Sequence, residues 1–138
     1  MIVCDTGPIV AAAIRNDDDN HACTGFTGLH LAGRTILVPG PVIAEVGYLL
    51  ERTGGPRVEA AFVRSCAEGS FTPVDLQTGD FARMADLVET YADFPLDTTD
   101  AAVIAVAERL GVTEIATLDH RHFRAVRPTH TQALILLP

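Results

Sequence analysis

The chain has 138 residues, which is the size of one domain and enough to bury a sizeable core. Its apolar content of 48% and charged content of 20% are ordinary for a compact globular protein and exclude a disordered chain. The formal net charge of −8 argues against an extended basic surface for nucleic acid. It does not exclude a nucleic-acid enzyme, because bound divalent cations and a few local arginines can reverse the field at a site.

The first half of the chain alternates short apolar runs with helical segments. Residues 2–4 predict a buried strand, followed by a turn and a helix with Pro8 in its first turn that extends to Ile14. A second helix is expected over about residues 20–32, and a second strand over residues 35–38. Two further helices are predicted over residues 41–52 and 56–68, each opened by a proline.

The second half continues the same alternation. Strands are predicted over residues 70–74, 114–118 and 131–137, and Pro73 indicates an edge position for the first of these. Helices are predicted over residues 79–91 and over a segment that starts near Asp97 and ends at Gly111. Because no hairpin turns separate the strands, residues 1–138 are expected to form a single α/β domain. The architecture is a three-layer α/β/α sandwich with a mostly parallel central sheet of about five strands.

An acidic residue lies on the apolar side of the helix that precedes Gly111. Asp100 heads a stripe formed by Val103, Ile104 and Ala107, where a buried carboxylate is unfavourable without a compensating hydrogen bond, cation or proton. The alternative is a helix cap, with Asp97 as the N-cap and Asp100 as the acidic residue of a capping box.

Three further acids occupy similar positions. Asp5 and Asp119 follow the first and fourth strands, at the sheet edge where open parallel α/β sheets bind ligands. Glu45 is the only charge in residues 42–50, on an otherwise apolar helix. A turn or helix cap is the alternative for Asp5 and Asp119, and a structural salt bridge to an arginine is the alternative for Glu45. Asp75 also follows a strand and is interpreted as a turn residue.

If the strand and helix ends converge, these four acids form one acidic pocket. Clustered carboxylates repel one another in a low dielectric, so cations are needed to keep all four ionised. Oxygen-only ligands suit Mg²⁺ or Mn²⁺ rather than zinc. Such ions activate water and neutralise charge that develops on a phosphodiester.

Four short segments together resemble a known family. They are Asp5-Thr6-Gly7, Val42-Ile43-Ala44-Glu45, Thr99-Asp100-Ala101-Ala102 and residues 117–123, and their order and spacing resemble the PIN-domain ribonucleases, most closely the VapC toxins. The resemblance implies a metal-dependent endoribonuclease that cuts RNA, often tRNA or rRNA, and that a VapB-type antitoxin inhibits. It implies a homodimer, and a heterotetramer or larger assembly with antitoxin. It maps the acidic site to Asp5, Glu45, Asp100 and Asp119, with Asp5 and Asp100 the firmest magnesium ligands.

The resemblance also assigns secondary roles and shows departures. Thr6 matches a hydroxyl residue that assists the metal or its water. Gly7 and His120 stand where a serine and a basic residue are common. Asp97 stands where a small residue is frequent, which makes it either an extra ligand or, as we favour, a helix cap.

Basic and histidine side chains follow Asp119. Arg121 and His122 are candidate substrate or water contacts, although a polar loop with a half-buried His122 beside Phe123 is the favoured alternative. Arg121, Arg124 and Arg127 form a basic cluster that suits either phosphate positioning or a solvated surface.

Cys4, Cys23 and Cys66 show no metal-binding spacing and are expected to be reduced, buried residues. The chain shows no signal-peptide pattern and no membrane-spanning run, and a cytoplasmic location is expected. The alternative function is a non-catalytic module, either receiver-like or a degenerate PIN-like binding domain. The absence of lysine from the chain disfavours a receiver, and the presence of all four acids disfavours a degenerate relative.

Overall fold

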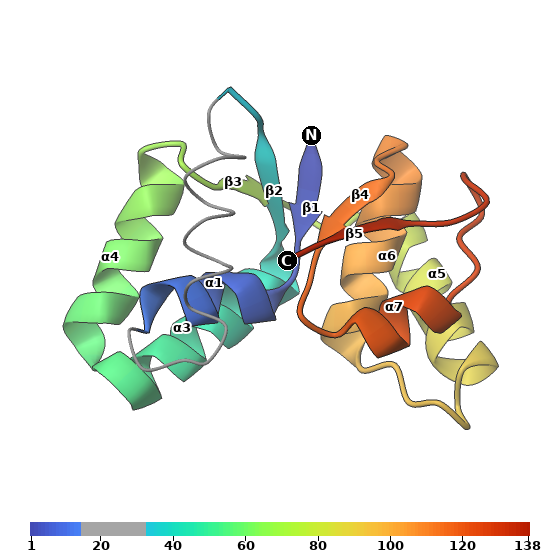
Figure 1. Cartoon of the computed structure of the whole chain (residues 1–138), viewed down its shortest axis with the longest axis horizontal. Helices are drawn as coiled ribbons and strands as arrows, with labels where there is room; N and C mark the ends of the chain where they lie inside the picture. Colours follow the sequence, from blue (N-terminus) through green and yellow to red (C-terminus); the bar gives the residue numbers. More distant parts are fainter. Residues whose placement is uncertain (15–32) are drawn as a thin grey trace.

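A computed structural model describes residues 1–14 and 33–138, which form a five-stranded, entirely parallel sheet flanked by helices (Figure 1). The strands are β1 (Ile2–Cys4), β2 (Ile36–Pro39), β3 (Thr72–Val74), β4 (Glu114–Ala116) and β5 (Ile135–Leu137). The helices of the described part are α1 (Thr6–Ala13), α3 (Gly40–Gly54), α4 (Pro56–Ala67), α5 (Thr78–Thr90), α6 (Thr98–Leu110) and α7 (His120–Ala125). The predicted α/β sandwich around a parallel sheet is confirmed.

The strand order β3-β2-β1-β4-β5 places β1 at the centre of the sheet. Val3 lies opposite Leu37 of β2 on one side and opposite Ile115 of β4 on the other. The chain builds outward from β1 to β3 and then crosses to β4 on the opposite side, so the strand order reverses between β1 and β4. Parallel α/β sheets form ligand sites beyond the carboxyl ends of the strands at such a point. Asp5 directly follows β1 there, and Asp119 follows β4 by three residues.

Helix α6 is the most deeply buried helix of the described part. Every residue from Asp100 to Ala107 is at most 9% exposed, and the helix packs against β1, β2, α3 and α5. Its small alanine side chains allow this close approach on several faces. The helix starts after Asp97 and ends at Gly111, whose φ of +65° is the left-handed conformation that glycine adopts readily. Both predicted boundaries are therefore confirmed.

The prediction for residues after β4 is partly wrong. The sequence favours a polar loop around His122, but residues 120–125 form α7. The side chain of Asp119 caps this helix, and Phe123 (1% exposed) fixes it to the core. A helix of six residues is too short to show a hydrophobic period in the sequence. Strand β4 also ends two residues earlier than predicted, and β5 begins four residues later.

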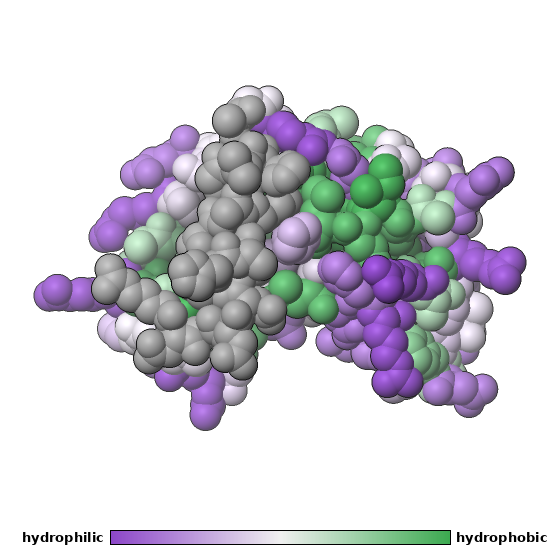
Figure 2. Space-filling view, viewed as in Figure 1, coloured by the Kyte–Doolittle hydropathy of each residue, from purple (hydrophilic) through white to green (hydrophobic). Residues whose placement is uncertain are grey.

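Several other expectations have a definite outcome. Strand β3 is an edge strand, as Pro73 predicted. Cys4 is buried in β1 and Cys66 is half-buried on α4, where burial raises the pKa of its thiol. The predicted helix over residues 20–32 and Cys23 lie outside the described residues. Within the described part, no helix has the length and apolar character needed to cross a bilayer. Figure 2 shows hydrophilic side chains gathered over α7 on the face seen in Figure 1.

Candidate active site

Asp5 is both a helix cap and a buried acid at the end of β1. Its Oδ1 atom accepts a hydrogen bond of 2.7 Å from the backbone N–H of Thr6, and its Oδ2 atom accepts one of 2.8 Å from the Thr117 hydroxyl. The residue is 7% exposed. Burial raises the pKa of Asp5, the hydrogen bonds from Thr117 and Thr6 oppose this, and the charges of Glu45 and Asp97 raise the pKa further. Capping therefore explains part of its environment, but the neighbouring acids make it part of a charged cluster as well.

Thr6 connects this acid to Glu45 on α3. The Thr6 hydroxyl donates a hydrogen bond of 2.5 Å to Glu45 Oε2, and Thr6 itself is 8% exposed. Glu45 is half-buried, so it reaches less far into the apolar interior than its helical neighbours suggested. No arginine pairs with Glu45 within residues 1–14 and 33–138, so its observed partner there is a hydroxyl and not the guanidinium considered as an alternative.

Asp100 lies on the first turn of α6 and is close to three carboxylates from outside that helix. The Asp97 carboxylate accepts a hydrogen bond of 2.8 Å from the Asp100 backbone N–H, which confirms Asp97 as the N-cap. The Asp100 carboxylate receives no hydrogen bond from the described residues, although Asp100 is only 9% exposed. Burial raises the pKa of Asp100 to about 7, and the charges of Asp97, Asp5 and Asp119 contribute to the increase.

Asp119 caps α7 and faces His122. Its Oδ1 atom accepts a hydrogen bond of 3.1 Å from the His122 backbone N–H. Its Oδ2 atom lies 2.5 Å from His122 Nδ1, a contact that is close without hydrogen-bond alignment. The same Nδ1 atom lies 3.9 Å from Asp100 Oδ2. His122 therefore stands between two of the predicted acidic residues.

Thr117 is a positioning residue whose role the sequence does not predict. It is fully buried, and its Oγ1 atom donates to Asp5 and accepts a 3.0 Å hydrogen bond from the Asp119 backbone N–H. One hydroxyl thus links the acids that follow β1 and β4. The sequence feature that could have identified Thr117 is a hydroxyl side chain near the end of the predicted strand over residues 114–118, two positions before Asp119.

Close packing accounts for one departure from the family pattern. A Cβ atom at Gly7 would lie 3.2 Å from the side chain of Leu118, which is tighter than ordinary van der Waals contact. Gly7 and Leu118 are therefore matched in size, and a serine at position 7 would require Leu118 to shift.

The structure places all four predicted acids in one electrostatic environment. Asp5 responds to Glu45, and Asp100 responds to Asp5 and Asp119. Asp97 is a fifth acid in the same environment. Among the described residues, no group of three or more Asp, Glu, His or Cys side chains is already arranged to hold a metal ion. The chemistry of the donor set, which is carboxylate oxygen throughout, nevertheless fits a hard divalent cation.

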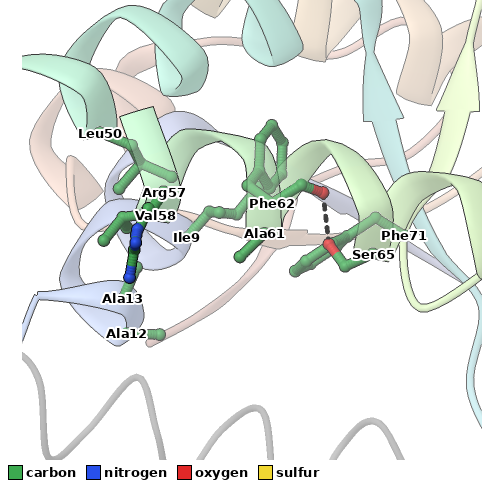
Figure 3. A pocket seen from close by; sticks show the side chains of 10 residues that line it. All are labelled: Ile9, Ala12, Ala13, Leu50, Arg57, Val58, Ala61, Phe62, Ser65 and Phe71. Atoms are coloured by element: carbon green, nitrogen blue, oxygen red, sulfur yellow. Dashed lines mark hydrogen bonds between the residues drawn. The ribbon is translucent and has the colours of Figure 1, made fainter. Parts of the chain in front are cut away.

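An apolar hollow, whose lining includes none of these acids, lies between α1, α3 and α4. It has a volume of about 470 Å³, and Phe62 and Phe71 form part of its wall. Figure 3 shows the side chains that line it, with Arg57 as the one charged group. Such a surface offers apolar contacts and no acid–base chemistry.

The fold and the acidic site define a PIN domain: the family model described as PIN domain matches residues 2–127, and the chain belongs to that family. Among individual relatives, the chain is similar to Ribonuclease VapC26 of Mycobacterium tuberculosis. The two are 27% identical over 137 residues, which cover 99% of this chain and 100% of the relative. The predicted resemblance to VapC-type PIN proteins is therefore confirmed.

Solved structures show the same fold. VapC20 of Mycobacterium tuberculosis, described as a Sarcin-Ricin loop cleaving toxin, superposes with a TM-score of 0.82 at 15% identity. That match covers 96% of this chain and 99% of VapC20. FitAcB from Neisseria gonorrhoeae superposes with a TM-score of 0.70 at 16% identity and covers 100% of this chain and 97% of its own.

Proposed function

We propose that this protein is a metal-dependent endoribonuclease, the toxin component of a type II toxin–antitoxin pair, that cleaves phosphodiesters of tRNA or rRNA. The observation that carries the proposal is the Asp100 carboxylate, which is nearly buried, receives no hydrogen bond from the described residues and has a pKa raised to about 7. Its neighbours Asp5, Asp97 and Asp119 are also acids. Such an arrangement is unfavourable for stability and is typical of a cation site.

Asp5 and Asp100 would hold the divalent ion, with Asp119 and Glu45 completing the acidic set. When bound, Mg²⁺ or Mn²⁺ would neutralise charge on the phosphodiester and make water a better nucleophile. The protein's own contribution is to fix its carboxylates in advance. Thr117 and the Thr6 backbone hold Asp5, while the Thr6 hydroxyl holds Glu45. An unprotonated carboxylate of this set is the acceptor for the proton that the attacking water loses.

Substrate contacts are assigned to Thr6, Arg121 and His122. Thr6 already donates to Glu45, so its contribution is to orient that acid or its water. Arg121 is exposed, and His122 lies beside Asp119 and Asp100, which suits both side chains to an RNA phosphate next to the acidic site.

The test is cleavage of single-stranded and structured RNA in Mg²⁺, in Mn²⁺ and in EDTA. Wild-type protein should cleave in either metal and stop in EDTA, and Asp5→Asn and Asp100→Asn should each abolish cleavage. Asp86→Asn, an exposed acid on α5, is the matched control and should cleave normally. Cleavage that survives chelation, or that survives both site substitutions, contradicts the proposal.

We also propose that a VapB-type antitoxin covers the apolar hollow between α1, α3 and α4. We further propose that the toxin is a cytoplasmic homodimer, and that it forms a heterotetramer or larger assembly with the antitoxin. The lining of the hollow is almost entirely apolar and includes two phenyl rings, so it suits the apolar face of a partner helix. Ala61 lines the hollow, and Ala61→Arg should weaken co-purification with the antitoxin while RNA cleavage persists. Unchanged co-purification contradicts this surface, and a monomer in size-exclusion chromatography contradicts the dimer.

A further inference from the structure

Three of the ten basic residues of this acidic chain lie within seven positions, at Arg121, Arg124 and Arg127. All three are exposed, whereas Phe123 and Val126 between them are buried at 1% and 5% exposure. The buried side chains fix α7 and the turn that follows it, so the three arginines are directed outward. Figure 2 shows this region as a concentration of hydrophilic side chains over α7.

One end of this arginine track is attached to the acidic site. The Arg121 guanidinium carbon lies 4.9 Å from the centroid of the Phe94 ring, a cation–π contact. The His122 ring packs edge-on against the same phenyl ring at a centroid distance of 4.8 Å. Because the His122 ring also contacts Asp119, the Phe94 and His122 rings together connect Arg121 to the candidate catalytic acids.

The other end of the track lines a separate hollow of about 500 Å³. Arg124 and Arg127 contribute to its wall, with Thr131 and Gln132 as further polar lining. The Arg127 backbone N–H donates a 2.9 Å hydrogen bond to the Tyr91 hydroxyl, so the main chain is anchored while the guanidinium remains exposed.

The charges of the track are not neutralised by the described part of the protein. Three other arginines, Arg34, Arg83 and Arg109, form ion pairs with carboxylates. Within residues 1–14 and 33–138, neither Arg121, Arg124 nor Arg127 has such a partner. A row of unpaired guanidinium groups attracts a polyanion, and arginine binds phosphate oxygens with two parallel hydrogen bonds.

We propose that Arg121, Arg124 and Arg127 bind successive backbone phosphates of a single RNA strand as it leaves the acidic site. The strand crosses Arg121 on its Phe94 support, follows α7, and enters the hollow lined by Arg124 and Arg127. The track offsets the repulsion between RNA and a chain of net charge −8, and it fixes the direction in which the strand lies across the carboxylates. This inference rests on the proposed function, because it takes the acidic site as the place of cleavage.

The test separates binding from cleavage. Anisotropy of a fluorescein-labelled single-stranded RNA of mixed sequence is measured in EDTA over a series of KCl concentrations. Each phosphate contact on a single strand contributes about 0.7 to the slope of log K against log salt, so the double variant Arg124→Gln/Arg127→Gln should lower that slope by about 1.4. At about 0.1 M salt this corresponds to roughly 25-fold weaker binding. Arg121→Gln should remove about 0.7 more.

The matched control is the double variant Arg52→Gln/Arg64→Gln on α3 and α4, which removes the same charge from two exposed arginines elsewhere in the fold. It should bind RNA nearly as wild type, and Arg124→Lys/Arg127→Lys should recover most of the lost affinity. An unchanged slope in the Gln variant of the track, or an equal loss in the Arg52→Gln/Arg64→Gln control, overturns the proposal. If the track variant keeps its RNA affinity but loses affinity for polyglutamate, the patch serves an acidic polypeptide and the proposal is likewise overturned.

A separate arm distinguishes this inference from the proposed function. Wild-type protein that binds RNA through the track but does not cleave it in Mg²⁺ contradicts the nuclease and leaves the track in place. Cleavage by the wild type together with unaltered RNA binding by the track variants overturns the track and leaves the nuclease in place.

Discussion

Replacing Asp100 by asparagine should make the metal-free protein more stable at neutral and alkaline pH, although it removes a candidate catalytic residue. In the folded protein this carboxylate is nearly buried among Asp5, Asp97 and Asp119, and burial with these charges raises its pKa from 3.8 to about 7. Asparagine has almost the same shape and cannot ionise. The substitution therefore tests whether the acid opposes folding when no cation is bound.

The direction of the pH effect follows from the difference in pKa between the two states. The folded state binds the Asp100 proton more tightly than the unfolded state does, so ionisation lowers the free energy of unfolding. The penalty is absent below the unfolded pKa of about 4, grows as the pH rises to about 7, and is fully present above that. A shift of about three pH units corresponds to about 4 kcal/mol. Asparagine loses the favourable charge at the start of α6, an opposing effect of at most about 1 kcal/mol.

The assay is urea unfolding of the wild type and Asp100→Asn in EDTA. The advantage of the variant in free energy of unfolding should increase by about 2–3 kcal/mol between about pH 5 and about pH 8. Asp86→Asn, on the exposed face of α5, should show no such pH-dependent difference. Adding Mg²⁺ at about pH 8 should stabilise the wild type and not the Asp100 variant. A stability difference that stays constant with pH, or that favours the wild type in EDTA at the higher pH, would refute this account of the site.

Three further predictions concern stability, each measured by urea unfolding. Thr117→Val should lower the free energy of unfolding by about 2 kcal/mol, because Asp5 loses a hydrogen-bond donor and the Asp119 N–H loses its acceptor. A change near zero would contradict the linking role of this hydroxyl. Phe123→Ala should lower the free energy of unfolding by about 3–5 kcal/mol, because it removes the buried side chain that fixes α7 to the core. A loss as small as that of a surface substitution would show that other contacts hold α7. Gly111→Ala should lower the free energy of unfolding by about 1 kcal/mol, because the φ of +65° at the end of α6 strains a residue with a Cβ atom. A variant as stable as the wild type would contradict this reason.

The sequence alone determined the element pattern and the identity of the acids. Alternating apolar runs and helices without hairpin turns required a parallel sheet, and the cap at Asp97 and the glycine at position 111 marked the limits of α6. These features are local: a cap, a hydrophobic period or a strand-terminating turn is encoded by neighbouring residues. The sequence also identified Asp5, Glu45 and Asp100 as candidate site residues. A single acid within an apolar segment can be recognised from its neighbours in the sequence alone.

Only the tertiary structure decided how these acids are held and what surrounds them. The hydroxyl of Thr117 joins the residues after β1 and β4, and the His122 ring enters the space between Asp119 and Asp100. The short helix α7, which turns three arginines outward beside that space, forms because Phe123 packs into the core. The Thr117–Asp5 contact joins residues 112 positions apart in the chain, and the His122–Asp100 contact joins two different helices, α7 and α6. Their energies depend on distance and burial in the folded state, and neither quantity exists until the strands have paired.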